Sequence, residues 1–167
     1  MKREDSKKLS IEDIVKLYSY CIDELVERNV LRTKNVTGEL GEFYAQLFYK
    51  KKKNIDLVLK PVSTEGVDAV CNDTRYAIKG ITGKTTSVFY GVTEDKDNKV
   101  FDKLIIVILS DKFLPIQIVE TDWEVFYELK RKHSTMDAYN ISVTKELLNR
   151  SIVYDVGEDI DNFSIED

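Results

Sequence analysis

The stretch that decides the fold runs from Gly66 to Gly80 and reads GVDAVCNDTRYAIKG. Two short runs at 67–71 and 75–81 are rich in apolar residues, with the polar triplet 72–74 (Asn-Asp-Thr) between them. Asn and Asp tolerate the backbone angles of tight turns, and short apolar runs on either side of such a turn are typical of strands. The stretch therefore predicts two neighbouring strands joined by a short turn.

The two predicted strands carry a carboxylate and an ammonium group. Alternate residues of a strand share a face, so Ala77 and Lys79 point to the same side of the second strand. Pairing of the strands would bring Asp68 and Lys79 to one site. A carboxylate binds hard cations such as magnesium, and a nearby lysine orients or activates water and offsets phosphate charge. The pair is therefore suited to phosphodiester hydrolysis.

A helix predicted from about Val36 to Tyr49 adds two more carboxylates. Glu39 and Glu42 are three residues apart, so they lie on one flank of this helix, beside its apolar stripe. A carboxylate on this flank would complete a metal site from the layer next to the sheet.

The order of these segments resembles the PD-(D/E)XK restriction-endonuclease-like superfamily, in the branch with a helix Glu, then Asp, then Gln/Glu-x-Lys. The resemblance rests on Thr33-Lys34-Asn35, Gly38-Glu39-Leu40-Gly41-Glu42, Gly66-Val67-Asp68-Ala69-Val70 and Ile78-Lys79-Gly80, and it covers about residues 32–110. It implies that Glu42 and Asp68 are metal ligands and that Lys79 is the catalytic lysine. Glu39 is a second candidate for the helix ligand. The implied cofactor is Mg²⁺ or Mn²⁺.

The chain departs from the superfamily pattern at one position. Ala77 stands two residues before Lys79, where the pattern has Glu, Asp or Gln, and a methyl group cannot bind a metal. Three interpretations stay open. Glu39 or Glu65 substitutes for the missing ligand, the backbone carbonyl of Ile78 and water molecules suffice, or the site is weakened or inactive.

The rest of the chain predicts one α/β domain, a restriction-endonuclease-like core with a mixed central sheet flanked by helices. The apolar run Leu104–Leu109 has no polar face, so it predicts a central strand buried on both sides. A single domain is expected over residues 1–154, followed by an acidic tail over 157–167. Its expected parts are an N-terminal helix (10–30), a core (32–121), and C-terminal helices and a strand (122–156).

The charge pattern permits DNA binding. The net charge is −5, but residues 155–167 carry six acidic side chains and no basic one, so the rest of the chain is at +1. Residues 31–90 hold ten basic and six acidic side chains. A locally basic section can contact phosphates. Four residues are candidates for DNA contact: Lys34, Lys51, Lys84 and Thr85.

These observations lead to a metal-dependent DNA endonuclease of a restriction or other defence system as the expected function. The alternative is a catalytically inactive DNA-binding or partner-binding module on the same fold. A third possibility is an interaction domain whose first helix pairs with a partner. The expected partners are DNA and either a second copy of the chain or another subunit.

No apolar run is long enough to cross a membrane, and the N-terminus lacks a signal region, so the expected location is cytoplasmic. Cys21 and Cys71, without metal-site spacing, are expected to be buried free thiols.

Overall fold

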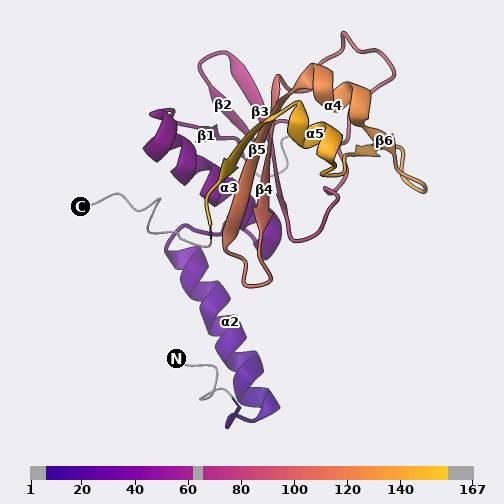
Figure 1. The fold of residues 1–167 in the computed structure, drawn as a ribbon. Helices are drawn as coiled ribbons and strands as arrows, with labels where there is room; N and C mark the ends of the chain where they lie inside the picture. Colours follow the sequence, from indigo (N-terminus) through magenta and orange to yellow (C-terminus); the bar gives the residue numbers. More distant parts are fainter. Residues whose placement is uncertain (1–6, 62–65, 158–167) are drawn as a thin grey trace.

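The computed structural model describes residues 7–61 and 66–157, which form a mixed six-stranded sheet with helices on both sides (Figure 1). The helical elements are α2 (Ile11–Glu27), α3 (Val36–Phe48), the π-helix η1 (Tyr49–Lys53), α4 (Trp123–Leu129) and α5 (Lys145–Asn149). The strands are β1 (Val58–Leu59), β2 (Ala69–Cys71), β3 (Thr74–Ile81), β4 (Lys103–Leu109), β5 (Pro115–Asp122), β6 (Arg131–Lys132), β7 (Tyr139–Asn140) and β8 (Ile152–Asp155). The predicted α/β class with a mixed central sheet is confirmed.

The order of strands in the main sheet is β1-β2-β3-β4-β5-β8. β3 and β4 are parallel, and every other neighbouring pair is antiparallel. β4 lies between β3 and β5, and the side chains of 104–107 are fully buried. The prediction of a buried central strand at Leu104–Leu109 is therefore confirmed. The tight turn between β2 and β3 is also present, and Asn72 adopts the left-handed conformation (φ 49°) that the turn requires.

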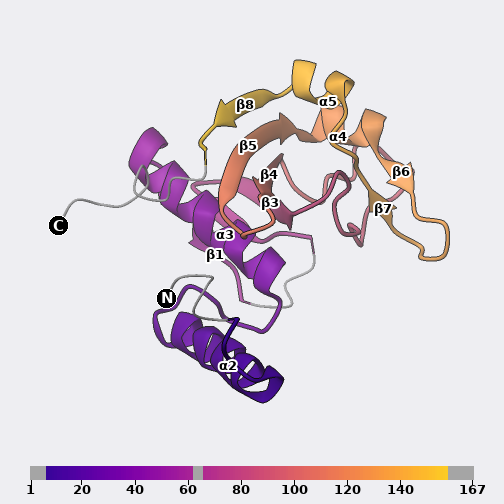
Figure 2. The same ribbon diagram turned by 60° about the horizontal axis from the view of Figure 1, so that its bottom comes forward.

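Each face of the sheet has its own apolar layer. Alternate residues of β4 supply both layers, because Ile105 and Val107 join the cluster under α3, whereas Leu104 and Ile106 join the cluster under α4 and α5. Figure 2 shows α3 on one side of the strands and the α4–β6 region on the other. A strand covered on both faces has to be apolar throughout, which explains the composition of β4.

The N-terminal helix is present but largely uncovered. Ser10 caps α2 by accepting a hydrogen bond from the backbone N–H of Asp13, and the helix projects away from the sheet (Figures 1 and 2). The apolar residues of α2 recur at helical spacing and form an apolar stripe, of which Ile22 is buried and most other members are exposed. Cys21 and Cys71 are free thiols, as expected, but the expectation that both are buried is wrong: Cys21 lies on the exposed surface of α2 and Cys71 is half-buried.

The structure differs from the sequence prediction around residues 82–140. The sequence of residues 87–92 favours a strand, but in the structure this segment contains only an isolated bridge between Phe89 and Tyr139. The helix expected at 122–133 ends at Leu129, because the chain continues into the hairpin of β6 and β7. Within 7–61 and 66–157, no helix is long and apolar enough to cross a membrane. The acidic tail falls mainly outside the described residues, as does Glu65.

Candidate metal site between α3 and β3

The candidate site lies where α3 packs on the sheet. Gly41 of α3 sits against Gly80 of β3, and a Cβ atom on Gly41 would be 2.6 Å from the Gly80 backbone. A Cβ on Gly80 would be 2.2 Å from the carbonyl oxygen of Thr37. Only glycine permits so close an approach of two backbones. The contact places α3 on the face of β3 that carries Ile78 and Gly80, whereas Ala77 belongs to the cluster on the opposite face.

Asp68 lies just before β2, and hydrogen bonds to the segments on both sides hold it in place. Its backbone N–H donates to the carbonyl oxygen of Tyr76 at 2.9 Å. Its carbonyl oxygen accepts a hydrogen bond from the N–H of Lys60 at 2.8 Å. Its side-chain Oδ2 accepts one from the backbone N–H of Ile78 at 2.7 Å. These contacts hold the Asp68 carboxylate next to the residue that precedes Lys79.

Glu42 projects from α3 towards this carboxylate. Its side chain is 15% exposed, and its Oε2 accepts a hydrogen bond from the guanidinium of Arg32. Burial raises the pKa of Glu42 to about 7, and the negative charges of Asp68 and Glu39 add to this increase. Arg32 and, more weakly, Lys79 oppose it. The charges of Asp68 and Lys79 therefore both act on Glu42, although Lys79 itself lies over Phe89, which belongs to the cluster on the face of the sheet opposite α3.

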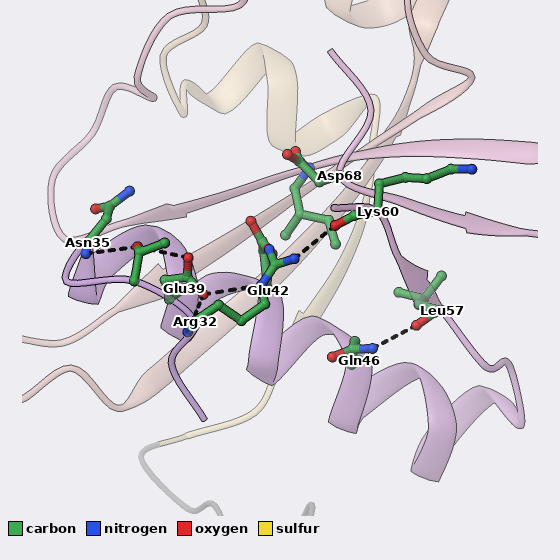
Figure 3. Close-up of polar contacts among 10 residues, drawn as sticks. Arg32, Asn35, Glu39, Glu42, Gln46, Leu57, Lys60 and Asp68 are labelled. Carbon is green, nitrogen blue, oxygen red and sulfur yellow. Dashed lines mark hydrogen bonds and ion pairs between the residues drawn. The ribbon is translucent and has the colours of Figure 1, made fainter. Parts of the chain in front are cut away.

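Glu39, the second candidate for the helix ligand, has a different environment. It is 7% exposed, and its Oε2 accepts a hydrogen bond from the backbone N–H of Arg32 at 2.8 Å and a longer one from Arg32 Nε. Its Oε1 accepts one from the hydroxyl of Thr33 at 2.9 Å. Both oxygens are therefore occupied in holding the segment before α3. Figure 3 shows Arg32 between Glu39 and Glu42, with Asp68 on the far side of Glu42.

The residues of β3 face opposite layers. The side chain of Ile78 is buried in the cluster under α3. Ala77 is 1% exposed and belongs to the opposite cluster, together with Phe89. The ammonium group of Lys79 lies over the ring of Phe89, 5.1 Å from its centroid. Phe89 therefore supports the lysine from the loop that follows β3, and position 77 is enclosed rather than open to water.

The carboxylates present match the requirements of magnesium only in part. Among the described residues, no group of three or more His, Cys, Asp or Glu side chains is placed to hold a metal ion. Mg²⁺, however, is commonly bound by one or two protein carboxylates, with water and substrate phosphate completing its shell. Glu42 and Asp68 supply two carboxylates: burial is the main cause of the raised pKa of Glu42, and repulsion by the Asp68 charge adds to it. A divalent cation between them would relieve that repulsion, so the two residues fit the group that the sequence implied.

The four predicted DNA contacts do not form one cluster around the site. Lys34 is exposed in the segment before α3, close in sequence to Glu39. Lys84 and Thr85 are exposed in the loop after β3, where the Thr85 hydroxyl lies 2.9 Å from that of Ser142. Lys51 is exposed in η1, about 14 Å from Glu42 along the helix at 1.5 Å per residue.

The structure adds one residue that sequence reasoning missed. Arg32 contacts both candidate helix ligands, and its Nη1 donates to the carbonyl oxygen of Lys60 at 2.8 Å. The available signal was an arginine just before a helix that carries two carboxylates on one flank. Its other contact is with the backbone carbonyl oxygen of Lys60, and a pattern of side chains in the sequence cannot predict a contact with a backbone atom of another segment.

Comparison with known proteins adds no relative. No protein-family profile matches the sequence, and no curated protein matches it significantly. The functional argument therefore depends on the residues themselves.

Proposed function

We propose that this protein is a metal-dependent DNA endonuclease of the PD-(D/E)XK type, acting in restriction or another defence system. The observation that carries the proposal is the grouping of Glu42, Asp68 and Lys79. Glu42 comes from α3, Asp68 from the residue before β2 and Lys79 from β3, and the charges of Asp68 and Lys79 both contribute to the pKa of Glu42. The helix-then-three-strands order that supplies them agrees with the resemblance seen in the sequence.

The side chains divide the chemistry between them. Glu42 and Asp68 would hold Mg²⁺ or Mn²⁺, which supplies Lewis-acid polarisation of the phosphate and a more acidic bound water. The ammonium group of Lys79, held over Phe89, offsets phosphate charge and orients the attacking water. The hydrogen bond from the Ile78 N–H fixes one oxygen of Asp68, which limits the rotation of this carboxylate. Lys34, Lys84 and Thr85 would contact phosphates outside the reacting group.

The test is nicking of supercoiled plasmid with Mg²⁺ or Mn²⁺. We expect Asp68→Asn, Glu42→Gln and Lys79→Met to abolish nicking while the protein stays folded. Asp73→Asn, in the exposed turn between β2 and β3, and Lys145→Met, at the exposed start of α5, are the matched controls and keep the activity. Nicking that persists in all three site variants would refute the assignment. Folded protein that never nicks but binds DNA would favour the inactive binding module, for which Ala77 is the main argument.

A second candidate function is partner binding through α2. Ile11, Val15 and Tyr18 are 83%, 61% and 65% exposed on the predicted apolar stripe of this helix. Adjacent exposed apolar side chains at helical spacing are typical of a surface that another helix covers. This surface is compatible with a nuclease that works as part of an assembly and with a module that only binds.

A further inference from the structure

The guanidinium of Arg32 connects three parts of the chain. Its Nε lies 3.4 Å from Glu39 Oε2, its Nη1 donates to the carbonyl oxygen of Lys60 at 2.8 Å, and its Nη2 donates to Glu42 Oε2. The Arg32 backbone N–H donates to Glu39 as well, at 2.8 Å. The side chain is 31% exposed; its contacts with Glu39 are partly buried, whereas those with Lys60 and Glu42 are exposed. A planar group held at three edges has little freedom left to rotate.

Glu39 is the fixed end of this arrangement. It is almost fully buried, and its two oxygens accept three hydrogen bonds from Arg32 and Thr33. Using Glu39 as a metal ligand would require breaking these bonds inside a poorly solvated environment, which is costly. Glu42 is more exposed than Glu39, and in the described contacts its Oε1 accepts no hydrogen bond. Of the two glutamates, Glu42 therefore has the free oxygen.

We propose that Arg32 is a positioning residue for the metal site: anchored by Glu39 and the Lys60 carbonyl, it holds Oε2 of Glu42 and leaves Oε1 available to the cation that Glu42 and Asp68 would hold. The inference rests on the proposed metal site and deepens it by dividing the two glutamates into a ligand and an anchor. Carboxylates that bind metals are themselves held by outer hydrogen bonds, and removing such a partner typically lowers metal affinity about 10- to 100-fold. Arg32 also fixes the edge of the sheet at Lys60, whose N–H binds the Asp68 carbonyl. It therefore connects the positions of both carboxylates.

The test is titration of the full chain with Mn²⁺ at constant pH, followed by the electron paramagnetic resonance signal of free Mn²⁺. We expect Arg32→Met to weaken Mn²⁺ binding about 10- to 100-fold. Arg32→Lys should fall between Arg32→Met and the natural chain, because a single ammonium cannot reach all three partners at once. The matched control is Arg28→Met: Arg28 also pairs with a glutamate, Glu24, but on α2. This variant should bind Mn²⁺ like the natural chain.

A double-mutant cycle separates positioning from general damage to the fold. Glu39→Gln keeps the shape of the anchor and removes its charge, so it should weaken Mn²⁺ binding through Arg32. Combined with Arg32→Met, it should add little further loss, because both changes act on the same contact. Thermal melting of each variant checks that the protein is folded.

The possible outcomes are distinct. If Arg32→Met binds Mn²⁺ as tightly as the natural chain, or more tightly, the guanidinium does not position Glu42 and the inference fails. If Glu42→Gln and Asp68→Asn weaken Mn²⁺ binding in the same experiment, the metal site itself is retained. If no folded variant and not even the natural chain binds Mn²⁺, the metal site and the inference fail together. Loss that is fully additive in the cycle would also overturn the inference.

Discussion

Gly41 of α3 and Gly80 of β3 are in backbone contact, with no space for a side chain on either. We expect Gly80→Ala to lower the free energy of unfolding by at least about 1–3 kcal/mol, the usual cost of overpacking. The added Cβ would meet the Thr37 carbonyl and move α3 away from the sheet. Mn²⁺ binding should weaken as well, because Glu42 moves with the helix. Urea denaturation measures the stability change.

The control for this change is Gly83→Ala. A Cβ atom on Gly83 would have no other atom within 4 Å, and the φ of Gly83 is not in the left-handed region. The substitution should change stability by no more than about 0.5 kcal/mol. Equal effects of the two substitutions would show that the close packing of α3 on β3 is not a structural constraint.

The pKa of Glu42 predicts a pH-dependent stability. Its pKa is about 7 in the folded protein and 4.5 in the reference state, so the folded protein binds more protons between these values. The free energy of unfolding should therefore decrease as pH rises from about 4.5 to 7. Glu42→Gln has no proton to lose. Relative to the natural chain, this variant should gain stability between pH 5 and pH 8, by at most about 3 kcal/mol.

The control for the pH experiment is Glu124→Gln. A hydrogen bond from Lys99 lowers the pKa of Glu124, so its titration lies below pH 4.5. The stability difference between this variant and the natural chain should stay constant from pH 5 to pH 8. Denaturation curves at four or five pH values decide the question, and a flat difference for Glu42→Gln would contradict the prediction.

Restoring a ligand at position 77 should have two opposing effects. Ala77 is 1% exposed in an apolar cluster, so Ala77→Glu or Ala77→Gln both crowds this layer and buries a polar group, and should cost at least about 1–3 kcal/mol of stability. The new oxygen lies two residues before Lys79 on the same strand, so both variants should bind Mn²⁺ more tightly and nick plasmid faster. The nicking must disappear when Lys79→Ala is added. Activity that survives Lys79→Ala would indicate a contaminant or another site.

The exposed apolar side chains of α2 predict that this helix binds a partner and that they contribute little to the stability of the fold. Replacing Ile11 and Tyr18 by Asp should leave the melting temperature within a few degrees, because both side chains already face water. If α2 binds a second copy, light scattering should show a dimer for the natural chain and a monomer for the variant. A natural chain that is monomeric at high concentration would leave a different subunit as the partner.

The sequence predicted the elements whose pattern is set by local burial. The run at 104–109 is apolar on both faces, which is typical of a central strand, and the structure places it there. It did not predict β6 and β7, because two-residue strands have no periodicity to detect. It also extended α4 too far. Lys130 leaves the helix, and its ammonium group lies over the rings of Tyr127 and Tyr139, a tertiary contact.

The candidate site followed the same division. Glu42, Asp68 and Lys79 were proposed as site residues from their residue types and order, whereas their environments depend on the fold. Glu39 and Glu42 share a flank of α3, yet one is enclosed by Arg32 and Thr33 and the other is not. Spacing alone could not separate them. The enclosure of Ala77 was equally hidden, because it depends on the loop that carries Phe89.

The position of the site in the chain has a consequence for the order of folding. The residues of the proposed site lie in α3, in the antiparallel strands β1, β2 and β3, or in the segments beside them; they are Arg32, Glu42, Asp68 and Lys79. By contrast, β4 pairs in parallel with β3 only after the crossover 82–102. Closing a longer loop costs more entropy and slows the pairing that depends on it. We therefore expect the site to form in the part of the molecule that folds first. The later strands would then stabilise a geometry that is already present. In pulsed hydrogen exchange, the amides of β2 and β3 that face each other should gain protection before those shared by β3 and β4.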